Sequence, residues 1–125
     1  MKKSLLAQFF LLILLVSPMS FGADLQKGVT AYTNGDYATA LREWTPLAEQ
    51  GDADAQFNLG QMYFNGQGVL QDNIYAHMWF NIVASLGNDD SSGNRDIIAK
   101  RMTPADISAA QKLARECVCK NYIGC

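Results

Sequence analysis

Two stretches share one pattern: DYATALREWTPLAEQG at residues 36–51 and DNIYAHMWFNIVASLG at residues 72–87. In each, an aspartate is followed at four-residue intervals by alanine, an aromatic residue and alanine, and then by a glycine. Residues four apart lie on one face of a helix, aspartate caps helix starts and glycine ends helices. Each stretch therefore predicts a helix with a small-aromatic-small seam. One unit cannot bury such a seam alone, so the pattern predicts an all-α solenoid of stacked repeats.

A second helix is expected before each of these two. Residues 24–34 and 52–65 carry apolar residues at helical spacing, and they contain Gly28 and Gly60 at equivalent places. A residue this small would let the two helices of a pair approach closely. The link to the following helix is four residues longer in the second unit, where it contains the glycine-rich segment 66–69.

The second unit resembles a complete Sel-one-like repeat. The resemblance rests on the run AQFNLGQMY at residues 55–63, the GQGV loop at residues 66–69 and the seam residues that follow. The first unit is similar to the related tetratricopeptide repeat. Units are expected at residues 24–51 and 52–87. The resemblance implies antiparallel helix pairs stacked as a short right-handed solenoid, whose concave face commonly receives peptides or protein segments.

The same resemblance implies a partner-binding surface on the first helix of each pair. Asn58 stands where peptide-binding tetratricopeptide domains place a carboxamide that holds the ligand backbone, and Gln26 is its equivalent in the first unit. A carboxamide suits this task because it offers both a donor and an acceptor. Gln61 and Asn65 follow one or two turns along. We expect an unidentified protein or peptide to contact these four residues.

The repeat pattern decays after residue 87. Residues 88–125 are expected to form a degenerate capping repeat. Residues 88–94 have the composition of a loop or a frayed helix start, and residues 95–101 predict a short helix. Thr103-Pro104-Ala105-Asp106 is a helix opening, with a threonine cap, a proline in the first turn and an acid three residues on. The last helix lacks the seam aromatic, as expected of a terminal unit that packs on one side.

An export signal is expected at residues 1–23. Lys2-Lys3 precedes the apolar run 5–16, and small residues follow, which places cleavage near Gly22 or Ala23. The apolar run is shorter than the roughly 20 residues that span a bilayer, so no membrane span is expected in the mature chain. The mature protein is predicted to be periplasmic or secreted.

Three cysteines lie near the C-terminus, and export would place them where disulfides persist. Cys117 and Cys119 are two residues apart, on nearly opposite sides of a helix, so they are not expected to pair. A Cys117–Cys125 disulfide is favoured, since Gly124 supplies a tight return of the chain. Cys119 is then a free thiol or an intermolecular one, which leaves a homodimer open.

Composition argues against several classes of partner. Without the leader the chain has eight Lys and Arg against twelve Asp and Glu, a formal charge of −4. This mildly acidic surface has no electrostatic footprint for nucleic acid or anionic lipid. His77 with the three cysteines would make a zinc site only in a reducing compartment, so no metal or cofactor is expected. Trp79 lies beside the seam and is expected to be partly exposed.

Catalytic motifs are absent from the sequence. No mature serine begins a Ser-x-x-Lys motif, no Gly-x-Ser-x-Gly elbow occurs, and His77 is the only histidine. The leading hypothesis is therefore a non-catalytic, exported adaptor or scaffold of the bacterial cell envelope that binds a protein or peptide. The first alternative is a hydrolase of cell-wall or β-lactam substrates without recognisable motifs. The second is an envelope assembly or stability factor without a discrete ligand.

Overall fold

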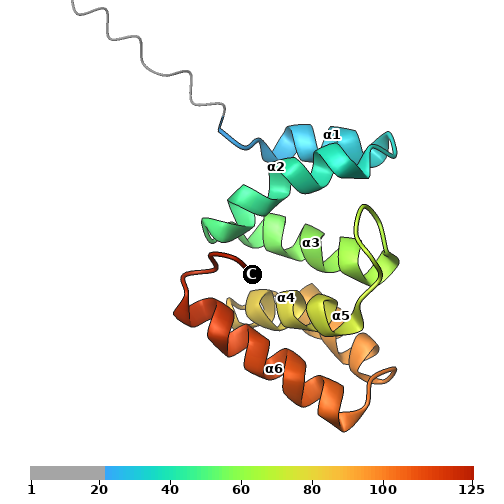
Figure 1. Ribbon diagram of the computed structural model, residues 1–125, viewed down its shortest axis with the longest axis vertical. Helices are drawn as coiled ribbons and strands as arrows, with labels where there is room; N and C mark the ends of the chain where they lie inside the picture. Colours follow the sequence, from blue (N-terminus) through green and yellow to red (C-terminus); the bar gives the residue numbers. More distant parts are fainter. Residues whose placement is uncertain (1–21) are drawn as a thin grey trace, which may run out of the picture.

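The computed structural model describes residues 22–125, so all but the last two residues of the expected export signal lie outside the described part. Six helices and no strand occur between residues 22 and 125, which confirms the predicted all-α class (Figure 1). The helices are α1 (Leu25–Thr33), α2 (Tyr37–Glu49), α3 (Ala53–Asn65), α4 (Asn73–Ser85), α5 (Asp89–Ala99) and α6 (Pro104–Cys119).

Aspartate caps the first four helices, and the sequence pattern predicts this for the helices that follow Asp36 and Asp72. The side chains of Asp24, Asp36, Asp52 and Asp72 each accept a hydrogen bond from a backbone N–H in the first turn of the helix that follows. Each such cap contributes about 1 kcal/mol, because it satisfies a donor that has no partner within the helix. Thr103 and the side chain of Asp106 complete a capping box at the start of α6, also as predicted.

Close contact between a glycine and an aromatic ring holds each of the first two helix pairs together. A Cβ atom on Gly28 would overlap the indole of Trp44, and one on Gly60 would lie 2.8 Å from Cε1 of Phe80. The Trp44 and Phe80 side chains are 3% and 0% exposed, so the rings fill the space that the missing side chains leave. The predicted role of the two glycines is confirmed.

Helix α4 lies at the centre of the stack. It packs against α3, α5 and α6, whereas α2 links the first pair to the second through α3 (Figure 1). Helices α5 and α6 both pack mainly against α4, and they pack little against each other. The last two helices thus cap the stack without forming a regular repeat pair.

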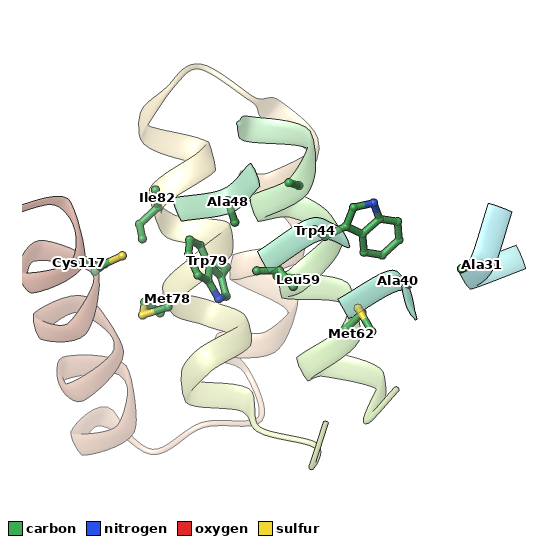
Figure 2. Packing of buried hydrophobic residues seen from close by; sticks show 12 residues of the cluster. Ala31, Ala40, Trp44, Ala48, Leu59, Met62, Met78, Trp79, Ile82 and Cys117 are labelled. Carbon is green, nitrogen blue, oxygen red and sulfur yellow. The ribbon is translucent and has the colours of Figure 1, made fainter. Parts of the chain in front are cut away.

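Two sequence-based expectations about this region are wrong. Residues 89–94 are helical, because the side chain of Asn88 accepts a hydrogen bond from the Ser91 N–H and starts α5 six residues earlier than expected. Trp79 is only 1% exposed. It lies in the same cluster as Ala48, Leu59 and Cys117, so helices on more than one side cover it (Figure 2).

Replacing Gly60 with alanine is expected to destabilise the fold by about 1–3 kcal/mol, since the new methyl group meets the buried ring of Phe80 and the helices must separate. Urea unfolding measures the change. Gly93→Ala is the matched control, because a Cβ atom at this position in α5 meets nothing within 4 Å. Better helix propensity is expected to stabilise that variant by about 0.5–1 kcal/mol. Equal effects of the two substitutions would contradict the close-approach argument.

Candidate functional site

A hollow of about 190 Å³ opens between α1 and α3, and we call it the α1–α3 hollow. Helix α1 contributes two lining residues one turn apart, α2 contributes the seam tryptophan, and α3 contributes three residues of one face. The lining residues are Val29, Tyr32, Trp44, Phe57, Asn58 and Gln61. The wall is therefore mostly aromatic, and two carboxamides supply its polar groups.

Hydrogen bonds hold two of the aromatic walls in place. The indole Nε1 of Trp44 donates to the carbonyl of Leu25 at 3.1 Å, which ties α2 to the start of α1. The hydroxyl of Tyr32 donates to Oε1 of Gln67 at 2.7 Å, and Nε2 of Gln67 donates to the hydroxyl of Tyr37 at 3.4 Å. Gln67 belongs to the longer loop of the second unit. This loop thus orients a ring that lines the hollow.

The four residues predicted to bind a partner do not all gather at this hollow. Asn58 and Gln61 line it, are half-buried, and make no side-chain hydrogen bond within residues 22–125. Gln26 and Asn65 are exposed and do not line it. The amide of Asn65 donates instead to Gln67, at 3.4 Å. Two of the four predicted residues therefore line one hollow, and the other two do not.

Sequence reasoning missed the aromatic residues of this site. The pattern predicts Trp44 only as a seam residue, and Tyr32 and Phe57 only as residues of the first helix in each pair. Trp44 is indeed buried, yet one face of its ring borders the hollow. A repeat pattern identifies which residues face a neighbouring helix, but it does not show where two neighbours leave a gap between them.

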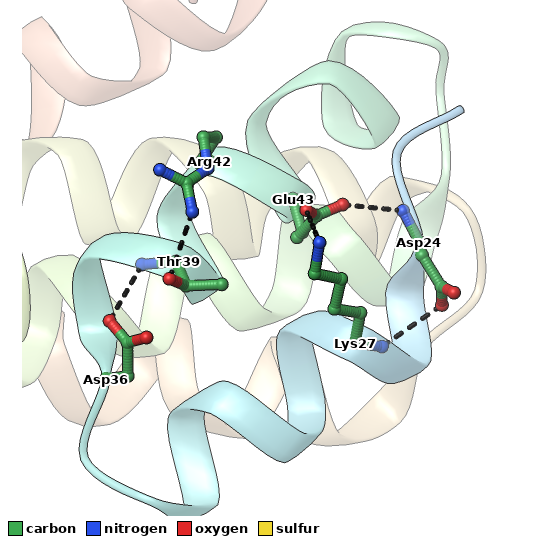
Figure 3. Close-up of polar contacts among 6 residues, drawn as sticks. All are labelled: Asp24, Lys27, Asp36, Thr39, Arg42 and Glu43. Atoms are coloured by element: carbon green, nitrogen blue, oxygen red, sulfur yellow. Dashed lines mark hydrogen bonds and ion pairs between the residues drawn. The ribbon is translucent and has the colours of Figure 1, made fainter. Parts of the chain in front are cut away.

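Asp24, Lys27 and Glu43 of the first helix pair contact one another outside the hollow. Nζ of Lys27 lies 3.3 Å from Oε1 of Glu43, and the backbone N–H of Asp24 donates to the other carboxylate oxygen at 3.0 Å (Figure 3). The hydrogen bond from Asp24 lowers the pKa of Glu43, and Lys27 adds to the effect. No Asp, Glu, Lys, Arg or His lines the α1–α3 hollow. An uncharged ligand surface therefore suits it.

A larger hollow of about 370 Å³ lies between α4 and α6. Ile82, Ala114 and Val118 give it an apolar lining, and Arg115 and Cys119 lie at its edge. The Cys119 thiol is free and exposed. The hollow lies on a different face from Asn58 and Gln61, since none of its lining residues belongs to α1, α2 or α3.

A disulfide joins Cys117 and Cys125, with Cα atoms 5.6 Å apart, and it closes the segment after α6 into a loop. Tyr122 of this loop packs on the main core cluster, and a Cβ atom on Gly51 would lie 3.3 Å from its ring. Asn121 and Tyr122 have φ angles of 52° and 66°, in the left-handed region, which turns the chain back. The last residues therefore reach the turn between α2 and α3 (Figure 1).

Residues 22–125 contain no group of three or more His, Cys, Asp or Glu side chains that would hold a metal ion. Within the same residues no helix is long and apolar enough to cross a membrane. His77 is 3% exposed, and its Nδ1 atom has no hydrogen-bond partner. Burial lowers the pKa of His77, and the nearby Arg95 guanidinium lowers it further. The Asp96 carboxylate acts in the opposite direction and raises this pKa. His77 is thus a buried residue of α4 and does not line the α1–α3 hollow.

Stacked helix pairs with glycine–aromatic seams define the molecule as a helical-repeat protein. Residues 53–88, which span α3 and α4, match the model of the Sel1 repeat. These residues of the chain therefore form a Sel1-like repeat.

A curated relative points to the same family. The chain is 35% identical over 78 residues to an exopolysaccharide production negative regulator from Rhizobium leguminosarum bv. viciae. The alignment covers 62% of this chain but only 29% of the relative. Sel1 repeats typically mediate protein–protein interaction.

Thiol titration is expected to distinguish the three cysteines. One thiol, Cys119, should react with Ellman's reagent in the native, non-reduced protein, and all three should react after reduction and unfolding. Loss of the disulfide by Cys125→Ser is expected to destabilise the protein by about 2–3 kcal/mol, because an open chain end has more freedom in the unfolded state. Cys119→Ser serves as the control and should change stability by no more than about 0.5 kcal/mol. Three reactive thiols in the native protein would contradict the pairing.

Mild acid is expected to weaken the fold through His77. Its pKa is lowered in the folded state, so the unfolded chain binds the proton more readily, and the unfolding free energy should fall as pH drops below about 6.5. Urea midpoints at about pH 7.5 and about pH 5.5 measure this loss. His77→Gln, which cannot titrate, should show a smaller difference between the two pH values. An unchanged difference would assign the acid sensitivity to other groups.

Proposed function

We propose that this chain is an exported, non-catalytic adaptor that binds a protein or peptide of the cell envelope through the α1–α3 hollow. One observation carries the proposal: the carboxamides of Asn58 and Gln61 border an aromatic hollow and have no hydrogen-bond partner within the described residues. A half-buried amide without a partner loses hydrogen bonds that a bound peptide backbone can restore. The Sel1 repeat match supports the same role.

Export is supported by two features of the chain. The first 23 residues have the order of a secretory signal, with Lys2-Lys3 before an apolar run and small residues after it. The Cys117–Cys125 disulfide is of a kind that persists in oxidising compartments. We therefore place the mature chain, from about residue 24, in the periplasm or outside the cell.

A binding role fits this hollow better than catalysis. Hydrolysis needs a nucleophile or activated water, and a base or acid within hydrogen-bond reach of it. The lining of the α1–α3 hollow offers two amides and the hydroxyl of Tyr32, which already donates to Gln67. The hydrolase alternative has no such constellation here to support it.

The similar protein from Rhizobium leguminosarum bv. viciae is a negative regulator of exopolysaccharide production, and a regulatory role is compatible with a surface that binds another protein. We propose that the present chain likewise acts on an envelope protein, although it covers less than a third of that relative. A second copy is a further candidate partner, since Cys119 is an exposed thiol. Monomer alone on non-reducing electrophoresis would remove a Cys119-linked dimer.

Affinity capture from envelope extract tests the proposal. The oxidised protein is used as bait beside the double variant Asn58→Ala, Gln61→Ala, and a retained protein is expected to be lost from the variant. The matched control is Ser108→Ala, Gln111→Ala, two exposed polar residues of α6, and it should capture as the parent does. Equal capture by all baits would place the binding surface elsewhere. Capture of nothing, together with reduced levels of an envelope complex in a deletion strain, would favour the assembly-factor alternative.

A further inference from the structure

The hollow between α4 and α6, which we call the α4–α6 hollow, differs in size and chemistry from the α1–α3 hollow. Its volume of about 370 Å³ lies within the range of about 300–1,000 Å³ that is typical of small-molecule sites, whereas the α1–α3 hollow measures about 190 Å³. Helices α4 and α6 pack against each other, and the hollow opens beside their contact (Figure 1). A site of this size can take a ligand larger than one side chain.

Apolar side chains form the base and one wall of the α4–α6 hollow. Ile82 and Ala114 line it, are buried, and belong to the main core cluster. Val118 lies one turn after Ala114 on α6, also lines the hollow, and is 47% exposed. An apolar surface is therefore open to water here. A ligand with an apolar body would remove that surface from water, which is favourable.

The free polar groups at this hollow are hydrogen-bond donors. Oδ1 of Asn81 accepts from Nη1 of Arg95 at 3.3 Å, and the Nδ2 amide group of Asn81 has no partner within residues 22–125. Arg115 makes neither an ion pair nor a side-chain hydrogen bond within the same residues. The hydroxyl of Ser85 already donates to the carbonyl of Ile82.

The charge at the α4–α6 hollow selects an anionic ligand group. Arg115 lines the hollow, and no Asp or Glu does. A guanidinium and an amide N–H without acceptors match the oxygen atoms of a carboxylate. A cationic head group would instead meet a like charge, which is unfavourable. The site therefore combines an apolar surface with donors for a single anionic group.

A fatty acid matches this combination better than a peptide does. Its carboxylate ends an unbroken chain of methylene groups, so one end meets the donors while the rest covers apolar surface. A peptide that ends in an apolar residue also offers a carboxylate. Its backbone, however, would bring N–H and C=O groups onto a surface that has few partners for them, which costs free energy.

We propose that the α4–α6 hollow binds a free fatty acid. The alkyl chain lies over Ile82, Ala114 and Val118. The carboxylate is held by the guanidinium of Arg115 and the Nδ2 amide group of Asn81. This site goes beyond the proposed function, because its lining shares no residue with the α1–α3 hollow and needs no protein partner there.

Protection of Cys119 from N-ethylmaleimide tests the inference, because this free thiol lines the hollow and a bound chain would cover it. The oxidised protein, expressed from its full-length sequence, is titrated with decanoate below the micelle concentration. Saturable slowing of the modification is expected, with a matching heat in isothermal titration calorimetry. Hexanoate keeps the head on a shorter chain, and decyltrimethylammonium keeps the chain with a cationic head. Each is expected to bind at least about tenfold more weakly.

Substitutions at exposed positions separate the head-group contact from the chain contact. Arg115→Gln is expected to weaken decanoate binding about tenfold and to change the binding of uncharged decanol by less than about twofold. Val118→Glu is expected to weaken both ligands about tenfold, because it places a charge beside the apolar surface. The matched controls are Lys100→Gln and Leu70→Glu, exposed positions that do not line the hollow, and both should bind as the parent does. Circular dichroism confirms that each variant is folded.

Other occupants of the hollow would give different results, and each would overturn the inference. Protection of Cys119 by acetyl-Gly-Gly-Leu with a free carboxylate, as strong as that by decanoate, would assign the hollow to a peptide terminus. A dimer of the Cys119→Ser protein in light scattering that Val118→Glu dissociates would assign it to a second copy. No protection by decanoate, or equal binding of decanoate and decyltrimethylammonium, would remove the fatty-acid site. The proposed function would stand in all these cases, since its test varies Asn58 and Gln61.

Discussion

The distance between paired helices is set by contact between a glycine and an aromatic ring, and the rest of the molecule depends on it. Gly28 meets Trp44 in the first pair and Gly60 meets Phe80 in the second. Because the ring lies against a bare backbone, each pair is close enough to bury alanines of its seam, Ala40 and Ala48 in the first pair and Ala76 in the second. In the first pair, Trp44 also lines the α1–α3 hollow. The contact that sets the helix spacing therefore also supplies a wall of the candidate site.

A short repeat protein must also cover the apolar faces at the ends of its stack. Helix α4 would present a largely apolar surface if the stack stopped after it, since most of its residues from Ala76 to Val83 are buried. Helices α5 and α6 cover it from different directions, and they do not rebuild a repeat pair. These two helices are less regular than a repeat pair, because α6 lacks the seam aromatic. They keep the apolar face of α4 from being exposed to water.

Local features of the structure could be predicted from sequence, and features that join distant segments could not. Aspartate caps act within three residues, and the close helix approach at Gly28 and Gly60 follows from their equivalent places in the repeat, so both were predictable. The start of α5 was missed because a run of Asp, Ser and Gly reads as a loop, although Asn88 caps it and Ser91 is buried against the fold. At the candidate site, Asn58 and Gln61 were expected from the family resemblance. The hydrogen bond from Tyr32 to Gln67 joins residues 35 positions apart, and no local sequence pattern predicts it.

The return of the C-terminal loop changes how this repeat protein can evolve. In an open solenoid each unit touches only its neighbours, so duplication of one unit lengthens the array without disturbing the others. Here Tyr122, just after the last helix, rests beside Gly51 at the first junction between units. Insertion of another helix pair between them would move Tyr122 away from Gly51 and break this contact. The contact therefore restricts the number of repeat units that the fold can hold.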